Sequence, residues 1–200
     1  MVQSEDPAVG DLAAFVRRSA DLMADEDRRN DAVAEAGPDG VTERLTVSQV
    51  ADLAARCAPG APASSLVSIV RVESAFAPLT VRVNGSHPRI YRPADRPEAI
   101  SLARSLIADG RSVDLGLAQI NSRNLARLNL SVEDAFDPCR NLAGAAEILN
   151  RGYEQALRVD HADRPILQMA YSIYNTGDTG RGLSNGYVAR VEAARRIAVR

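Results

Sequence analysis

The chain has 200 residues, of which 46% are hydrophobic and 25% charged, enough for one domain with a sizeable core and a shorter appendage. Charge is unevenly spread: residues 1–40 hold ten acidic residues and four arginines, a balance of −6, so residues 41–200 carry +4. That surplus is far below the basic surface of a nucleic-acid-binding protein, and we exclude that class of partner.

The sequence contains no run of about 18 apolar residues, so we expect no transmembrane helix. The first ten residues, Met1–Gly10, lack both the basic region and the apolar region of a secretory signal. This beginning fits a mature or trimmed form, or a protein exported by another route.

Residues 1–44 predict an acidic N-terminal arm or accessory segment. It has one weakly amphipathic stretch, Leu12–Met23, followed by an acidic run punctuated by Gly and Pro. The globular domain is expected over residues 45–200. Its first helix should begin at Thr46-Val47-Ser48-Gln49, which fits a capping box.

Apolar residues at helical spacing continue along the domain. A second helix is expected from Pro62 until Pro78 arrives, followed by an irregular, groove-lining connection over Arg82–Arg96. Further helices are expected at Glu98–Asp109, from Ser131, at Asn141–Leu157, at Ile166–Tyr174 and at Gly186–Val199. The long helix should turn Leu142, Ala145, Ala146, Leu149 and Tyr153 inward. Because only Leu79–Val83 has the pattern of a strand, the sequence predicts an all-α fold with minimal strand content.

Glu73 lies on the apolar face of the second predicted helix, one turn after Ile69 and Val70. A carboxyl group there must be paired, hydrogen-bonded or protonated, because loss of water raises its pKa. Such an environment produces a general acid. A salt bridge to Arg71 or another nearby arginine is the alternative.

Cys57 and Cys139 are 82 positions apart, with no CxxC spacing and no histidine nearby, which argues against a zinc or redox motif. A disulfide and two buried thiols both fit the sequence. His87 and His161 are isolated from each other and from the cysteines, and Gly-rich phosphate loops are missing. We therefore expect no metal and no cofactor.

Three short motifs follow one another along the domain: Glu73-Ser74, Gly116-Leu117-Ala118-Gln119 and Tyr174-Asn175-Thr176-Gly177. Their order resembles the lytic transglycosylases of the lysozyme-like superfamily, whose pattern is E-S, then G-L-M-Q, then Y-N-x-G. The family's methionine is Ala118 here. The resemblance covers about residues 45–195 and implies a lysozyme-like helical domain with a substrate groove.

Further stretches resemble the VirB-type branch of that family, which is associated with type IV secretion, pilus assembly or conjugation. They are Cys57-Ala58-Pro59, the loop holding Asn84, the run Asp137–Leu142 and the segment Ser184–Val188. The resemblance implies a disulfide between Cys57 and Cys139 and a periplasmic location. It also implies peptidoglycan strands as substrate, and secretion or pilus components as partners.

In that family the glutamate of the first motif protonates the glycosidic oxygen between N-acetylmuramic acid and N-acetylglucosamine. The same residue then accepts the proton of the muramic acid 6-hydroxyl, which attacks the anomeric carbon and closes a 1,6-anhydro ring. The resemblance gives this role to Glu73 and places at the substrate Gln119, Asn121, Tyr174 and Asn175, although securing the turn beside Tyr174 is the favoured role of Asn175. Tyr187 is a further residue that we expect to reach the groove. Helix-start caps for Gln119 and Asn121, and a core position for Tyr174, are the alternatives.

Two other functions fit the same residues. A peptidoglycan-binding assembly factor with weak catalysis would keep the fold, with the acidic arm docking a secretion component. A hydrolytic lysozyme would use water and a positioned aspartate such as Asp114. We expect Asp114 to be a loop residue rather than a charge stabiliser.

Overall fold

The computed structural model describes residues 43–159 and 164–198. All of them belong to the second of two compact units, Gly40–Arg200. The acidic arm predicted for residues 1–44, with its stretch Leu12–Met23, lies outside the described residues except for positions 43 and 44. The boundary at residue 45 stays a prediction.

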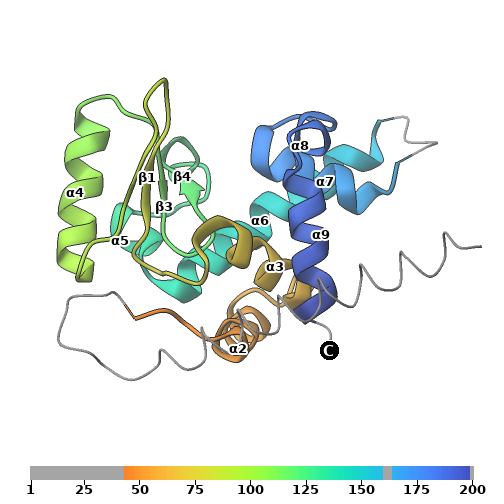
Figure 1. Cartoon of the computed structure of the whole chain (residues 1–200), viewed down its shortest axis with the longest axis horizontal. Helices are drawn as coiled ribbons and strands as arrows, with labels where there is room; N and C mark the ends of the chain where they lie inside the picture. Colours follow the sequence, from red (N-terminus) through yellow and green to blue (C-terminus); the bar gives the residue numbers. More distant parts are fainter. Residues whose placement is uncertain (1–42, 160–163, 199–200) are drawn as a thin grey trace, which may run out of the picture. The chain divides into compact units, whose positions relative to one another are not determined.

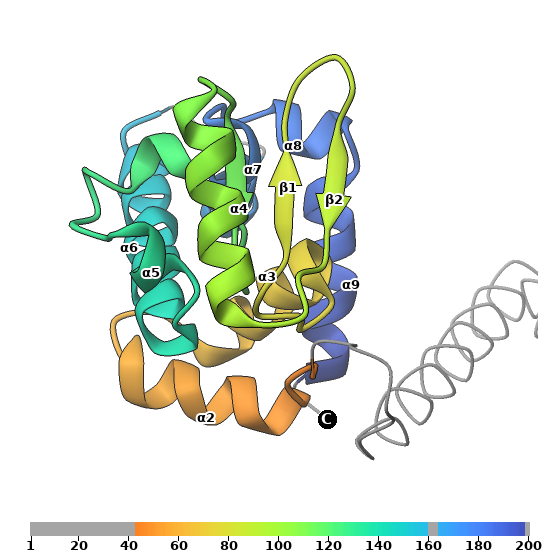
Figure 2. The ribbon, with the colours of Figure 1, turned by 90° about the vertical axis from the view of Figure 1, so that its left-hand side faces the viewer.

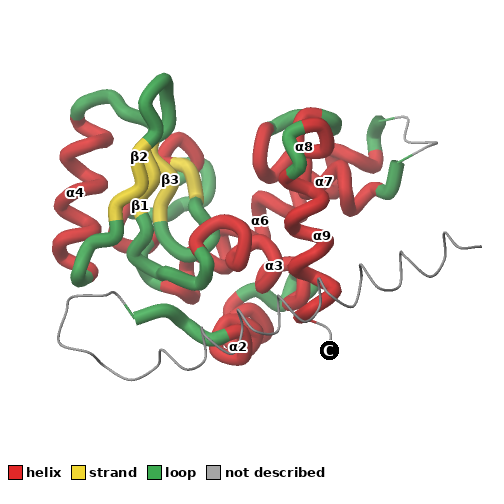
Figure 3. Tube along the Cα trace, in the orientation of Figure 1, coloured by secondary structure: helices red, strands yellow, loops and turns green. Residues whose placement is uncertain are grey.

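Helices make up most of the described residues, as Figure 3 shows. They are α2 (Val47–Cys57), α3 (Ala63–Ser74), α4 (Arg96–Ala108), α5 (Val132–Ala135), α6 (Pro138–Leu157), α7 (Ile166–Thr176), α8 (Arg181–Ser184) and α9 (Tyr187–Ala198), with a 3-10 turn η1 (Ser122–Asn124). Four short strands, β1 (Val81–Val83), β2 (Arg89–Tyr91), β3 (Val113–Leu115) and β4 (Ile120–Asn121), form an antiparallel sheet in the order β2-β1-β3-β4. The prediction of a mainly helical fold is confirmed.

Side-chain caps fix several helix starts. Thr46 Oγ1 accepts the N–H of Gln49 (3.2 Å), and Gln49 Oε1 accepts the N–H of Thr46 (2.7 Å), so the predicted capping box of α2 is confirmed. Asp95 and Asp137 each accept a backbone N–H in the first turn of α4 and α6. Helices α4 and α6 therefore begin slightly earlier than predicted. In each, a proline follows the capping aspartate within two residues, and proline suits a first helical turn.

Two apolar clusters divide this unit into a helical lobe and a sheet lobe. The helical lobe buries Leu66 and Leu142 among α2, α3, α6, α7 and α9, and the sheet lobe buries Leu115 and Phe136 among the strands, α4 and α5. In Figure 1 the sheet and α4 lie on the left and α7, α8 and α9 on the right, with α3 and α6 between them. Figure 2 shows α4 beside the hairpin of β1 and β2.

A disulfide joins Cys57, the last residue of α2, to Cys139 in the first turn of α6, with Cα atoms 5.4 Å apart. The disulfide implied by the family resemblance is therefore confirmed, and the alternative of two buried thiols is wrong. The closed loop contains α3 and the whole sheet lobe, so the crosslink restrains the segment that carries Glu73.

The connection Arg82–Arg96 is more regular than predicted, because it contains strand β2. Arg82 on β1 pairs with Ile90 on β2, and the side chain of Ile90 is 50% exposed. A three-residue strand whose central apolar side chain faces solvent has no alternating pattern, which explains the error.

Tyr153 was predicted to face inward from α6, and this prediction is wrong, since the residue is 41% exposed. The buried face of α6 passes instead through Leu149, Gly152 and Ala156. A side chain at Gly152 would meet the Ala170 carbonyl at 3.2 Å, so α7 approaches α6 closely at this point. Because α7 lies so close, the buried face of α6 includes the small Gly152 and not the larger Tyr153.

Removing the disulfide should destabilise the fold. We expect a Cys57→Ala/Cys139→Ala double variant to lose about 4 kcal/mol of unfolding free energy, because the crosslink removes chain entropy from the unfolded state over 82 positions. Urea unfolding followed by circular dichroism measures the loss, and reduced wild type should match the variant. A loss below about 1 kcal/mol would contradict the chain-entropy account.

Candidate active site

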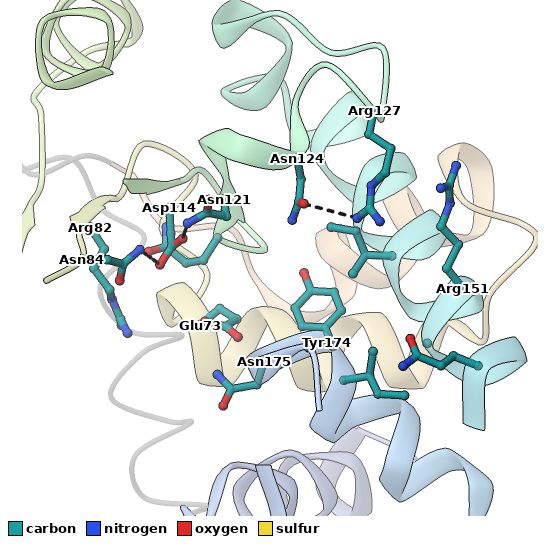
Figure 4. Close-up of a pocket in the computed structure, with 16 residues that line it drawn as sticks. Glu73, Arg82, Asn84, Asp114, Asn121, Asn124, Arg127, Arg151, Tyr174 and Asn175 are labelled. Atoms are coloured by element: carbon teal, nitrogen blue, oxygen red, sulfur yellow. Dashed lines mark hydrogen bonds between the residues drawn. The ribbon is translucent and has the colours of Figure 1, made fainter. Parts of the chain in front are cut away.

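Glu73 lies in the last turn of α3, where the two lobes meet (Figure 4). The next two residues, Ala75 and Phe76, have left-handed backbones, with φ of 49° and 65°. That conformation costs a residue other than glycine about 1 kcal/mol or more. Ser74 Oγ donates to the Leu117 carbonyl at 2.6 Å and so fastens this end of α3 to the second motif.

The carboxyl group of Glu73 accepts a hydrogen bond from Tyr187 Oη at 2.7 Å. Its bonded partner is thus a neutral hydroxyl, whereas the sequence left an arginine salt bridge as the alternative. Burial raises the pKa of Glu73 from its ordinary 4.5 to about 7, outweighing the lowering effects of Tyr187, Arg82 and Arg190, while the charge of Asp114 raises it further. A carboxyl group with this pKa is well suited to donate a proton near neutral pH.

The second motif forms a tight turn held by Asn141 of α6. Asn141 Oδ1 accepts the N–H of Ala118 (2.8 Å), and its Nδ2 donates to the carbonyls of Leu115 (3.0 Å) and Ala135 (2.7 Å). Asn141 is fully buried, so these bonds are shielded from water. Gly116 has φ of 74°, and a Cβ there would lie 2.1 Å from the Ala135 carbonyl oxygen, so only glycine fits.

Gln119 completes this turn and lines the groove described below. Its Nε2 donates to the carbonyls of Thr80 (3.1 Å) and Gly116 (2.8 Å), and its own backbone has φ of 52°. Its Oε1 is buried without a hydrogen-bond partner among the described residues. The amide therefore holds the turn, and its contact with substrate stays a prediction.

Tyr174 lies in the last turns of α7 and donates from Oη to the Ala118 carbonyl at 2.8 Å. Burial raises the pKa of the Tyr174 hydroxyl well above its ordinary value, so it stays neutral. The side chain of Ala118 is fully buried in the helical lobe. The residue that replaces the family's methionine therefore packs in the core.

Asn175 and Tyr187 are connected through Asn185. Asn185 Nδ2 donates to Asn175 Oδ1 (3.0 Å), and Asn185 Oδ1 accepts the N–H of Tyr187 (2.9 Å). Asn175 is exposed and lines the groove, whereas Tyr187 is 2% exposed and contacts Glu73 from the protein interior. The geometry gives Tyr187 a contact with the carboxyl group, and its predicted contact with substrate stays untested.

Asp114 is on strand β3, opposite Arg82 of β1, which corrects the expectation of a loop residue. Asn84 Nδ2 donates to Asp114 Oδ2 at 2.8 Å, and Asn121 Nδ2 donates to Asp114 Oδ1 at 2.6 Å, as Figure 4 shows. Asn121 Oδ1 also accepts the N–H of Arg123 and caps η1, as its alternative interpretation predicted. Asn121 thus combines a cap with a position on the groove.

A groove of about 560 Å³ lies between the lobes, lined by polar side chains from the sheet, α6 and α7. It brings together five of the predicted site residues, namely Glu73, Gln119, Asn121, Tyr174 and Asn175. Sequence reasoning did not assign the lining residues Arg82, Asn124, Arg127, Arg151 and Gln155. The last two share one face of α6, which by sequence looks like any solvent-exposed face.

Within residues 43–159 and 164–198, no helix is long and apolar enough to cross a membrane. The same residues contain no group of histidine, cysteine and acidic side chains that could hold a metal ion. His87 is exposed, and His161 lies outside the described residues.

The raised pKa of Glu73 predicts a pH-dependent stability difference. In the unfolded chain the group ionises near 4.5 and in the fold near 7, so the folded state binds more protons between these values and wild-type stability falls as pH rises. Glu73→Gln lacks this loss and should be more stable than wild type at pH 8 by up to about 3 kcal/mol. Denaturant unfolding at pH 4 and pH 8 measures the difference, and equal differences at both pH values would refute the raised pKa.

Tyr187→Phe should raise the pKa of Glu73 above about 7, because the hydroxyl lowers this pKa by hydrogen bonding to the carboxylate. A carboxyl ¹³C NMR titration of glutamate-labelled protein measures the pKa. Tyr171→Phe is the matched control, since it removes a buried hydrogen bond to Ser65 rather than one to Glu73. An unchanged or lower pKa in Tyr187→Phe would contradict the assigned contact.

The chain matches known proteins over the part that contains this site. A family model described as "Transglycosylase SLT domain" matches residues 52–187. The chain is 36% identical over 150 residues to "Protein virB1" of Rhizobium radiobacter, covering 75% of this chain and 62% of that protein. It is 35% identical over 148 residues to "Type IV secretion system protein virB1" of Brucella abortus biovar 1 (strain 9-941), covering 71% of this chain and 62% of that protein.

The match therefore spans 62% of the length of these relatives. No solved structure matches the chain. The family model covers more than half of the chain and includes Glu73, the turn held by Asn141, and Tyr174. The chain belongs to the transglycosylase SLT domain family.

Proposed function

We propose that this chain is a peptidoglycan lytic transglycosylase, with Glu73 as its single proton donor and acceptor. The observation that carries the proposal is a partly buried carboxyl group in a polar groove, with a pKa raised to about 7. Membership of the transglycosylase SLT domain family supports the choice of substrate. The bond cleaved is the β-1,4 bond between N-acetylmuramic acid and N-acetylglucosamine.

In the first step, protonated Glu73 transfers its proton to the glycosidic oxygen, and the bond from that oxygen to the anomeric carbon of the muramic acid breaks. Positive charge develops at the sugar ring as the leaving group departs. The hydrogen bond from Tyr187 then stabilises the carboxylate that Glu73 has become.

In the second step, the 6-hydroxyl of the same muramic acid attacks the anomeric carbon and gives its proton to the Glu73 carboxylate. A 1,6-anhydro ring forms, Glu73 is protonated again, and no water is consumed. One carboxyl group is sufficient for these two proton transfers because the substrate supplies the nucleophile. Hydrolytic glycosidases need a second carboxyl group for that purpose.

The groove lining supports a glycan substrate. Side-chain amides of Asn84, Asn124, Gln155 and Asn175 lie along it, and an amide both donates and accepts hydrogen bonds. Sugar hydroxyls and N-acetyl groups require both kinds of partner. The ring of Tyr174 adds a flat surface of the kind on which sugars pack.

We propose further that the protein opens peptidoglycan locally for a type IV secretion, conjugation or pilus system in the periplasm. The Brucella relative, named "Type IV secretion system protein virB1", supports the secretion context. The disulfide between Cys57 and Cys139 is compatible with an oxidising compartment.

Hydrolysis is the second candidate, and the position of Asp114 in the same groove favours it. In a lysozyme reaction a water molecule would attack the anomeric carbon and leave a reducing end. A binding protein with weak catalysis would leave the strands intact.

Digestion of purified peptidoglycan separates these functions. Wild type, Glu73→Gln and the matched control Glu154→Gln, which changes an exposed glutamate of α6, are compared by mass spectrometry of the released fragments. We expect 1,6-anhydro ends with wild type and the control, and a loss of about a hundredfold or more in Glu73→Gln. Reducing ends would establish hydrolysis instead, and intact strands with wild type would leave a binding role.

A further inference from the structure

The carboxylate of Asp114 is held at both of its oxygens. Its two hydrogen bonds come from opposite sides along the sheet, because Asn84 directly follows β1 and Asn121 belongs to β4, the two strands that flank β3. Asp114 pairs in register with Asn121 and with Arg82, and residues directly opposite each other point to the same face of a sheet. That face lines the groove that contains Glu73.

The bonded partners of Asp114 are neutral amides, so they orient the carboxylate without cancelling its charge. The ion pairs among the described residues do not include Asp114. Arg82 lies across the ladder, and its Nε is buried without a hydrogen-bond partner among these residues. A fixed negative charge thus faces the groove beside the proton donor.

We propose that Asp114, oriented by Asn84 and Asn121, stabilises the positive charge that develops at the sugar ring during cleavage. This inference rests on the proposed function and adds a second acidic residue to it. Asp114 moves no proton and forms no bond; Glu73 transfers both protons, and the substrate hydroxyl remains the nucleophile. A charge that is already oriented needs no rearrangement when the transition state forms, which is the condition for strong electrostatic stabilisation.

The same charge acts on Glu73 together with its other neighbours. The groups facing Glu73 are Tyr187 and Arg190 from α9, Tyr174 from α7, Arg82 from β1 and Asp114 from β3. Asp114 and Arg82 shift the pKa of Glu73 in opposite directions. Neutralising Asp114 should lower this pKa, whereas neutralising Arg82 should raise it.

Binding of two glycans tests the proposal without requiring turnover. The probes are a neutral tetramer of N-acetylglucosamine and an analogue whose reacting ring carries a protonated nitrogen, each measured by calorimetry. Asp114→Asn keeps the size of the side chain and removes its charge. We expect it to lower the affinity for the cationic analogue about tenfold or more and the affinity for the neutral tetramer less than threefold.

Asn84→Ala is the matched variant, since it removes one orienting hydrogen bond and keeps the charge. We expect Asn84→Ala to lose less affinity for the cationic analogue than Asp114→Asn does. Carboxyl NMR titrations of Asp114→Asn and Arg82→Gln should show the pKa of Glu73 moving down and up respectively. Circular dichroism establishes that each variant folds.

The outcomes are distinct. The proposal would be overturned if Asp114→Asn reduced the affinity for both glycans equally. It would also be overturned if Asn84→Ala reduced the affinity for the cationic analogue as much as Asp114→Asn does. Either result would mean that Asp114 only maintains the local network. Wild type that binds neither glycan would contradict the proposed function itself, together with the inference that rests on it. Selective loss of affinity for the cationic analogue supports the proposed role of Asp114, while the product ends described above test the proposed function.

Discussion

The groove depends on the buried amide of Asn141. This side chain belongs to a helix of the helical lobe, yet its three hydrogen bonds end on β3, on the following turn and on α5. Loss of the amide would remove three buried hydrogen bonds, each worth about 0.5–1.5 kcal/mol. The same turn accepts hydrogen bonds from Ser74 of α3 and Tyr174 of α7. Its position therefore fixes both helices that flank the carboxyl group of Glu73.

Helices were largely predictable because their signals are local. Capping residues and apolar spacing mark α2, α3 and α6 within a few positions of their observed ends. Strand β1 lies within Leu79–Val83, the one stretch predicted to have a strand pattern. The other three strands were not predicted, since segments of two or three residues are too short for an alternating pattern and the sheet forms only through pairing between distant segments. The exposed Tyr153 shows that close helix contact at a glycine decides which neighbouring position is buried.

The candidate site was predictable where residues belong to short ordered motifs, as with Glu73 and Gln119. Asp114 was misjudged because its partners, Asn84 and Asn121, reach it only through strand register, which the sequence does not reveal. Arg82 was missed for the same reason. Strand pairing brings Arg82, Asp114 and Asn121 together from distant parts of the chain, whereas the residues of one motif are close together in the sequence.

The hydrogen bond between Glu73 and Tyr187 spans a sequence separation of 114. In an unfolded chain Glu73 is a solvent-exposed glutamate with an ordinary pKa, so it is ionised at neutral pH and has no proton to donate. Burial of Glu73 and arrival of α9 are both needed before the carboxyl group acquires its raised pKa and its tyrosine partner. Chemical competence therefore requires α3 and α9 to be packed together, and an unfolded chain lacks it.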